Sequence, residues 1–273
     1  MSVIVMTREM GTLGKEVARE FAQKKGYRVV HHELVRTSEE RASLGEESEV
    51  YRFLEGSEAE TDAWRNNRAQ DGYLTPTEVL ELASEGEVLI RGWGATQLLK
   101  SVPNVLSVRV CAPIDFRVSV MKDRLGVDDH AARQEIKRSD AAHGRAFLRF
   151  FQNDWRAPEN YDLVLNTSHV SPSDCAEILL HATEAASFGE SDEMRSALSD
   201  ILLTEKIGET LRMAGVAGSR GRHVEASVDH GNVRLYGVVK DPDAPRAAER
   251  LLATKLGIDR IQNDIVHATG FGD

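Results

Sequence analysis

A glycine-rich turn reads Thr7-Arg8-Glu9-Met10-Gly11-Thr12-Leu13-Gly14-Lys15-Glu16, and it stands between a short β-branched run and a helical pattern. Backbone N–H groups at the start of a helix carry partial positive charge and have no acceptor within the helix, so such a turn attracts anions. A lysine at the end of the turn can reach terminal phosphates. These residues favour phosphate binding over an ordinary strand-to-helix connection.

The turn departs at two positions from the nucleotide-binding pattern G-x-x-x-x-G-K-[ST]. That pattern places a glycine where this chain has Glu9 and a hydroxyl residue where it has Glu16. A magnesium ion would then lack its usual hydroxyl ligand. Thr12 is the nearest substitute, and binding through water is equally open. From these residues alone, an ordinary turn remains the alternative.

Short β-branched runs alternate with helical patterns over the first two thirds of the chain, which predicts an α/β fold with a parallel five-stranded sheet. The stretch 33–84 is polar and acidic, and we expect it to be helical and to cover one edge of the site. Long helices are predicted over 128–151 and 172–186. The five expected strands are residues 3–6, 27–31, 88–91, 105–111 and 162–166.

The pattern changes after Ala186, where the small and acidic segment 187–192 indicates a linker. Beyond it, helical and alternating patterns follow one another in the order αββαβ over about 75 residues. This order predicts a small, separate α+β domain. We therefore expect two domains, residues 1–186 and 193–268.

Composition limits the partners of the protein. A formal net charge of −10 argues against nucleic-acid binding, which needs a basic face. The segment 117–149 nevertheless holds eight basic and five acidic residues, so an anionic ligand is expected there. No apolar run approaches the roughly 20 residues of a membrane helix, and the two cysteines lack metal-ligand spacing. We expect a cytoplasmic protein without integral membrane contact.

Several segments, in order along the chain, resemble the cytidylate kinase-like family. The glycine-rich turn is similar to the opening of that family, where serine-arginine-glutamate precedes a glycine-rich loop and a basic residue. The further matches are Val-Leu-Ile-Arg-Gly-Trp-Gly-Ala (88–95), Pro-Asn-Val-Leu (103–106), Ala-Pro-Ile-Asp-Phe-Arg-Val (112–118), Asp-Arg-Leu-Gly (123–126), Glu-Ile-Lys-Arg-Ser-Asp (135–140), Asp-Trp (154–155) and Tyr-Asp-Leu-Val-Leu-Asn-Thr-Ser (161–168).

This resemblance implies a P-loop kinase fold, the cofactors ATP and Mg2+, and transfer of the γ-phosphoryl group to a nucleoside monophosphate such as CMP or dCMP. Such chemistry consists mostly of positioning and charge neutralisation. The basic stretch would act as a lid, although by itself it could be a solvated amphipathic helix. The implied catalytic residues are Lys15, Arg138 and Arg145. The implied cofactor-binding residues are Gly11, Thr12, Leu13, Gly14, Lys15, Glu16, Arg117 and Arg124, with Thr12 at the metal.

The implied acceptor site holds His31, Arg91, Trp93, Lys137 and Asp140. Two departures from the family lie here, because relatives often place aspartate and a basic residue where this chain has His31-His32, and glycine-arginine where it has Gly92-Trp93. His31 could be a ligand or a hydrogen-bonded structural residue, and Trp93 could stack on a base or simply pack. The acceptor nucleotide therefore stays open.

The C-terminal segment resembles a BON domain over about 194–267. The resemblance rests on Gly231-Asn232-Val233-Arg234-Leu235-Tyr236-Gly237-Val238-Val239, on the alanines that follow, and on Gly257-Ile258-Asp259-Arg260-Ile261-Gln262-Asn263. It implies no catalytic residues but a ligand-sensing or assembly role, with a ligand or lipid and an oligomer among the open partners. Two hypotheses follow for the whole chain, an active nucleotide kinase or a nucleotide-binding sensor that has lost its chemistry.

Overall fold

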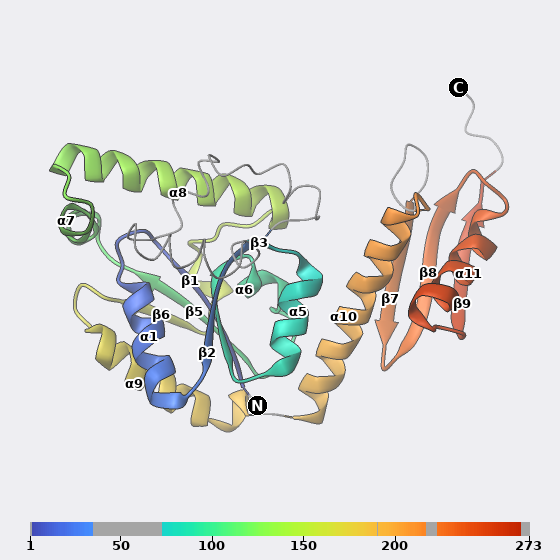
Figure 1. The fold of residues 1–273 in the computed structure, drawn as a ribbon, viewed down its shortest axis with the longest axis horizontal. Helices are drawn as coiled ribbons and strands as arrows, with labels where there is room; N and C mark the ends of the chain where they lie inside the picture. Colours follow the sequence, from blue (N-terminus) through green and yellow to red (C-terminus); the bar gives the residue numbers. More distant parts are fainter. Residues whose placement is uncertain (1, 35–72, 190, 217–222, 269–273) are drawn as a thin grey trace, which may run out of the picture. The chain divides into compact units, whose positions relative to one another are not determined.

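The computed structural model describes residues 2–34, 73–189, 191–216 and 223–268 (Figure 1). The chain divides into two compact units, Met1–Ser191 and Asp192–Asp273, and each is described by itself. Most of the stretch expected to cover one edge of the site, residues 35–72, lies outside the described residues. Among the helices that the structure describes, none combines the length and apolarity needed to cross a membrane.

The first unit is built on a parallel sheet with strand order β3-β2-β4-β1-β5-β6. The five predicted strands are confirmed, and the structure adds β3 beside β2 at one edge, a strand of two residues that is too short to give a sequence pattern. The strands are β1 (Val3–Arg8), β2 (Arg28–Leu34), β3 (Tyr73–Leu74), β4 (Val88–Trp93), β5 (Val105–Cys111) and β6 (Leu163–Asn166).

Strand β1 lies inside the sheet, between β4 and β5. Every one of its residues is buried, which is typical of a strand covered on both faces. On one face, Ile4 and Met6 pack with side chains of α1 (Gly14–Lys25) and α9 (Pro172–Glu184), such as Phe21 and Leu179. The other described elements of the unit are α5 (Pro76–Glu85), α6 (Ala95–Leu98), α7 (Ile114–Leu125), α8 (Asp129–Phe151), η1 (Pro158–Asn160) and η2 (Ala186–Phe188).

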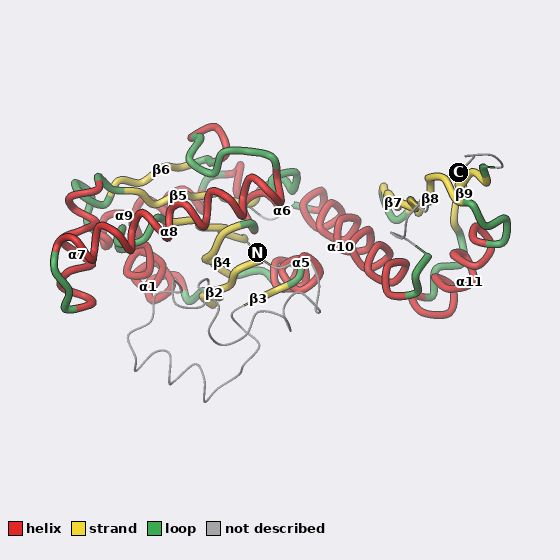
Figure 2. The backbone as a smooth tube through the Cα atoms, turned by 90° about the horizontal axis from the view of Figure 1, so that it is seen from above, coloured by secondary structure: helices red, strands yellow, loops and turns green. Residues whose placement is uncertain are grey.

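The long predicted helix is confirmed as α8, and Asp128 caps its first turn by accepting a hydrogen bond from the N–H of Ala131 at 2.8 Å. Both views place α8 across the carboxyl end of the sheet, above the turn from β1 into α1 (Figure 1, Figure 2). Its inner side carries Ile136, which packs with Met10 of that turn. The helix α8 therefore covers the turn between β1 and α1, in which the sequence predicts phosphate binding.

The second unit has the predicted order αββαβ. Its strands form one sheet in the order β7-β8-β9, in which β7 and β8 are antiparallel and β8 and β9 are parallel. The expected linker is partly structured, because η2 covers residues 186–188 and Phe188 packs against the core of the first unit. The elements of the second unit are α10 (Asp192–Met213), β7 (His223–Asp229), β8 (Asn232–Val239), α11 (Ala244–Leu256) and β9 (Ile261–His267).

Candidate phosphate-binding site

The β1–α1 loop, residues 9–13, follows the central strand at the carboxyl end of the sheet, where ligands bind in open α/β folds. Its last residue, Leu13, is the N-cap of α1 and adopts φ 57°, and no side chain caps the helix. The N–H groups of Gly14, Lys15 and Glu16 belong to the first turn and have no acceptor within the helix. This helix end can therefore bind an anion with its backbone.

Two glycines fix the course of the loop. Gly11 has φ +80°, and a Cβ atom added to it would lie 2.7 Å from the carbonyl oxygen of Arg117. A Cβ atom on Gly14 would lie 2.9 Å from the Cβ atom of Arg8. Side chains do not fit at either position because α7 and the end of β1 approach the loop this closely.

We expect Gly11→Ala to lower the free energy of unfolding by about 2–5 kcal/mol, from positive φ and overpacking together. Gly26→Ala is the matched control, since Gly26 has φ +79° and nothing within 4 Å of an added Cβ atom, so only the backbone cost of about 1–2 kcal/mol remains. Urea denaturation of both variants measures the difference. Equal losses would mean that the contact with Arg117 relaxes at no cost.

Thr12 stabilises the loop through two hydrogen bonds. Its hydroxyl donates a hydrogen bond to the carbonyl oxygen of Glu9 at 2.7 Å, and its own carbonyl oxygen accepts one from the hydroxyl of Thr167 at 2.6 Å. The residue is 1% exposed. The predicted metal ligand is thus part of the loop's own scaffold, and this geometry does not favour a direct bond to magnesium.

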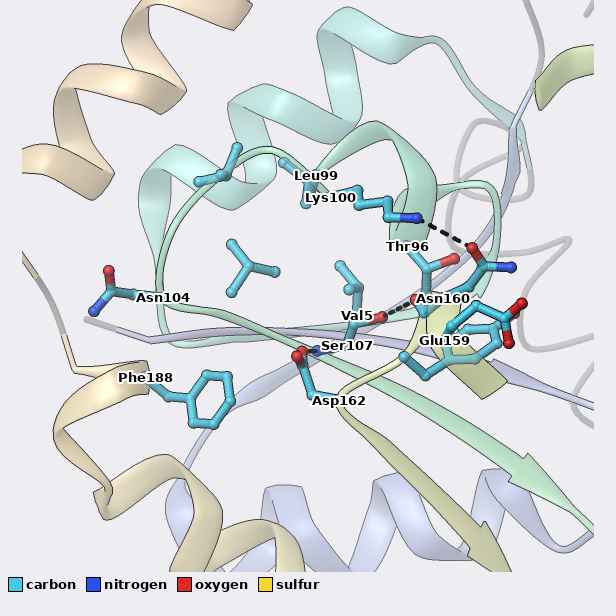
Figure 3. Close-up of a pocket in the computed structure, with 13 residues that line it drawn as sticks. Val5, Thr96, Leu99, Lys100, Asn104, Ser107, Glu159, Asn160, Asp162 and Phe188 are labelled. Atoms are coloured by element: carbon cyan, nitrogen blue, oxygen red, sulfur yellow. Dashed lines mark hydrogen bonds between the residues drawn. The ribbon is translucent and has the colours of Figure 1, made fainter. Parts of the chain in front are cut away.

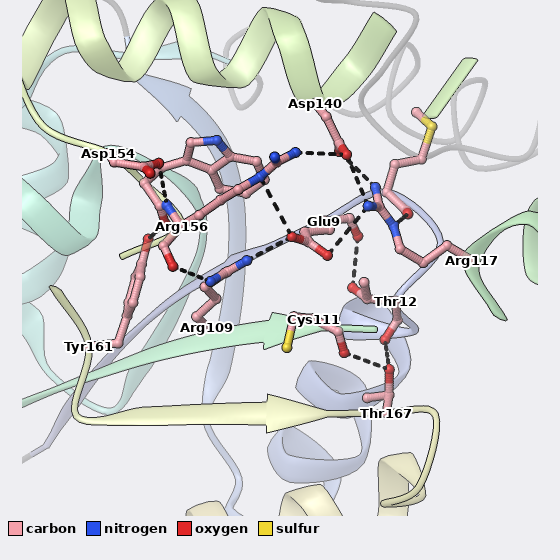
Figure 4. Close-up of polar contacts among 12 residues, drawn as sticks. Glu9, Thr12, Arg109, Cys111, Arg117, Asp140, Asp154, Arg156, Tyr161 and Thr167 are labelled. Atoms are coloured by element: carbon pink, nitrogen blue, oxygen red, sulfur yellow. Dashed lines mark hydrogen bonds and ion pairs between the residues drawn. The ribbon is translucent and has the colours of Figure 1, made fainter. Parts of the chain in front are cut away.

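A cluster of charges, buried except for Arg156, lies between the loop and α8 (Figure 4). The Glu9 carboxylate is 2.7 Å from the guanidinium of Arg109 and 3.4 Å from that of Arg117. Arg117 also makes two hydrogen bonds to Asp140, at 3.0 and 2.7 Å, and donates from Nε to the carbonyl oxygen of Met10 at 2.7 Å. We call Glu9, Arg109, Arg117, Asp140 and Arg156 the carboxylate–guanidinium cluster.

Two ion pairs, one inside the cluster and one outside it, engage four of the predicted binding residues. Arg117 and Asp140 were assigned to the cofactor and the acceptor, and the structure pairs them with each other. Arg124 and Glu16, both assigned to the cofactor, form a second ion pair at 2.9 Å. The charge of each of these side chains is balanced inside the fold, so their roles in ligand binding stay predictions.

Comparison with known proteins matches both parts of the sequence. The sequence profile described as "Cytidylate kinase-like family" matches residues 3–169, well over half of the chain. The chain belongs to the cytidylate kinase-like family. A second profile, that of the BON domain, matches residues 199–268. Both predicted resemblances are confirmed.

A curated cytidylate kinase from Sulfolobus acidocaldarius is 33% identical over 75 residues, which are 28% of this chain and 41% of the relative. The chain thus spans less than half the length of that relative. Among solved structures, an uncharacterized protein from Eubacterium ventriosum (16% identity, TM-score 0.45) matches 68% of this chain and 99% of its own. Shikimate kinase from Bacteroides thetaiotaomicron (16% identity, TM-score 0.36) matches 67% and 99%.

The lid residues that the sequence predicts for this cytidylate kinase-like chain lie on the outside of α8. Arg138 is half-exposed and lies 3.6 Å from Glu135, and Arg145 and Lys137 are exposed. At about 100° per residue, Arg138 and Arg145 lie roughly opposite Ile136, which faces the loop. The structure therefore does not bring these two arginines to the β1–α1 loop in the present arrangement of α8.

Three of the predicted acceptor residues of this cytidylate kinase-like chain lie on β2 and β4, and the other two, Lys137 and Asp140, lie on α8. His31 and Arg91 are direct neighbours in the sheet, and the ring Nδ1 of His31 is 3.1 Å from the carbonyl oxygen of Arg91. Arg91 is buried, and Trp93 is the last residue of β4. The structure places His31, Arg91 and Trp93 on two neighbouring strands, and their contact with an acceptor stays a prediction.

A cavity of about 290 Å³ lies elsewhere in the first unit, beneath α6 and against the first half of β5 (Figure 3). Its wall is held together by Lys100, whose ammonium donates to Asn160 Oδ1 at 3.1 Å, and by Ser107, whose N–H donates to Asp162 at 2.7 Å. Since it is lined by residues of the first half of β5 and by residues just before β6, and by none of the β1–α1 loop, it is separate from the candidate phosphate site.

Sequence reasoning missed Arg109 and Arg156. Arg109 interrupts the apolar pattern of β5, and a charged residue inside a buried strand is a signal that could have been followed. Arg156 follows Trp155 in an irregular segment between α8 and η1, where no periodicity predicts the direction of a side chain. The ion pairs of Arg109 with Glu9 and of Arg156 with Asp140 are known only from the structure.

Proposed function

We propose that the protein is a nucleoside monophosphate kinase that transfers the γ-phosphoryl group of ATP to CMP, dCMP or a related nucleotide. One observation carries this proposal, the uncapped first turn of α1 at the end of the central strand, with Lys15 in that turn. Membership in the cytidylate kinase-like family supports it. In this proposal the N–H groups of residues 14–16 bind the phosphates, and Lys15 neutralises charge on the transferred group.

Among the described residues around the loop, one carboxylate oxygen, Glu16 Oε2, has no hydrogen-bond partner, while the other candidate ligands of magnesium are engaged. The hydroxyl of Thr12 is engaged with the Glu9 carbonyl, and the carboxylates of Glu9, Glu16 and Asp140 are paired with arginines. Mg2+ commonly keeps several waters and binds through substrate phosphates. We therefore assign it in this proposal to the nucleotide phosphates and to water, and no step of the reaction is derived from it.

A coupled assay of ADP release across the common ribo- and deoxyribonucleoside monophosphates tests the proposal. We expect turnover with at least one pyrimidine monophosphate, and ATP with Mg2+ should raise the melting temperature because it binds the native state. If α8 closes on the nucleotide, Arg138→Ala and Arg145→Ala should each lose about a hundredfold in turnover while ATP affinity changes only a few-fold.

The second candidate function is a nucleotide-binding sensor without kinase activity. The outward position of Arg138 and Arg145 and the pairing of Glu16 with Arg124 favour it, because both leave fewer cations for a transition state. Turnover with no acceptor, together with ATP-dependent thermal stabilisation, would establish the sensor and refute the kinase. In a sensor, the BON domain would transmit the signal of nucleotide binding. We propose a ligand-sensing or assembly role for this domain under either function.

A further inference from the structure

The side chain of Arg156 lies in the space between the β1–α1 loop and α8 (Figure 4). Its Nη2 atom is 3.0 Å from Asp140 Oδ2, and its Nε atom is 4.0 Å from Glu9 Oε1. The guanidinium carbon lies 5.4 Å from the centroid of the Trp155 ring, which is buried. Arg156 thus reaches from an irregular segment to the phosphate end of the sheet.

The three guanidinium groups of the carboxylate–guanidinium cluster differ in their access to solvent. The side chains of Arg117 and Arg109 are 5% and 11% exposed, whereas that of Arg156 is 49% exposed. Arg117 and Arg109 cannot reach a ligand without leaving buried carboxylates unpaired, which is costly. Within this cluster, Arg156 is the member that can exchange a protein partner for a ligand.

The charge count of the cluster points the same way. Three arginines face two carboxylates, which leaves one positive charge in excess. Without Arg156, Asp140 would keep both hydrogen bonds from Arg117, and Glu9 would keep Arg109 at 2.7 Å. Arg156 is therefore not needed to neutralise the carboxylates, and its charge remains available for an anion.

The backbone that carries Arg156 is firmly held. Its N–H donates to Asp154 Oδ1 at 2.9 Å, and its carbonyl oxygen accepts a hydrogen bond from Arg109. Asn160 Nδ2 donates to the carbonyl oxygen of Asp154 at 2.8 Å. A side chain on a fixed backbone and stacked on an aromatic ring loses little entropy when it binds a ligand.

We propose that Arg156 contacts a phosphate group of the nucleotide bound at the first turn of α1, moving from Asp140 to the ligand. This inference rests on the proposed function, since it concerns the same site. A guanidinium suits this task because it stays protonated and can hold two phosphate oxygens at once. While no ligand is bound, contacts with Asp140 and the Trp155 ring hold the Arg156 side chain near the loop.

Calorimetric titration with ATP–Mg2+, and separately with inorganic pyrophosphate, tests the assignment in the full chain. Arg156→Gln should weaken binding of both probes by about tenfold or more and shift the melting temperature without ligand by no more than about 2 °C. Arg28→Gln is the matched control, because Arg28 is 53% exposed, pairs with Glu85 at 2.6 Å and lies at the amino end of β2. It should leave both affinities unchanged.

Each other result has one meaning. Wild-type affinity in Arg156→Gln overturns the contact. A large loss of melting temperature without ligand in Arg156→Gln would indicate a structural role. Arg156→Lys then decides whether the ligand contact exists as well. Recovery of stability without recovery of affinity retains the contact, and recovery of both refutes it. If wild type binds pyrophosphate through Arg156 but not ATP, the kinase proposal and the nucleotide contact both fail, and Arg156 belongs to a site for a smaller phosphate anion. If it binds neither probe, both fail.

Discussion

Replacing Arg117 by methionine should lower the free energy of unfolding by about 3–5 kcal/mol, the cost typical of removing one partner from a buried ion pair. Arg117 is 5% exposed and makes paired hydrogen bonds to Asp140, a 3.4 Å contact with Glu9 and a hydrogen bond to the Met10 carbonyl. Methionine fills similar volume but offers no donor, so two buried carboxylates and a carbonyl oxygen lose a partner.

Urea unfolding followed by circular dichroism measures this loss. Arg28→Met serves as the control, because the exposed pair Arg28–Glu85 should contribute no more than about 1 kcal/mol. Arg117→Lys keeps the charge but not the paired geometry, and we expect it to recover only part of the stability. A change within 1 kcal/mol for Arg117→Met would show that Arg109 and Arg156 can balance Glu9 and Asp140 without it.

The same cluster gives Glu9 a physical reason to stand where the common nucleotide-binding pattern has glycine. A carboxylate at the start of the loop costs free energy to bury unless cations surround it. Arg109 and Arg117 supply those cations from β5 and α7, and Arg117 also reaches Asp140 on α8. The loop is thus linked to α8 through the ion pairs of Arg117.

Local patterns account for what could be predicted. The strands are short β-branched runs, and the αββαβ order of the second unit is marked by its glycine turns. The contacts of the cluster could not be predicted, because Arg109 and Glu9 are 100 residues apart in the chain. Pairing of this kind depends on the register of β1 with β5 and on the place of α7, which sequence periodicity does not encode.

The directions in which side chains point were the second feature that the prediction from sequence did not capture. The lid stretch was correctly predicted as helix, but which of its cations face the loop depends on how α8 packs. Buried Ile136 and Ala132 fix that rotation, and their period could have shown that Arg138 lies on the other side. The role of Thr12 was beyond the sequence, because a threonine hydroxyl in a loop can bond to its own backbone or to a ligand.

The second large effect concerns Lys15. We expect Lys15→Ala to lower kcat by about a hundredfold to a thousandfold, the loss typical of removing one group that stabilises transition-state charge. The side chain belongs to the first turn of α1, so its ammonium can add to the positive end of the helix where the phosphates are proposed to lie. The measurement is phosphoryl transfer to the best acceptor, with ATP affinity determined on the same preparations.

The comparison needs a control that changes charge without touching the site. Lys25→Ala fits, because Lys25 is an exposed residue of the last turn of the same helix, and it should leave both kcat and ATP affinity unchanged. If Lys15→Ala weakens ATP binding as much as it slows turnover, the lysine contacts the ground state alone. If neither quantity changes, Lys15 does not contact the phosphates, and the titrations of Arg156→Gln decide whether an anion binds at the first turn of α1 through the backbone N–H groups and Arg156 without the lysine.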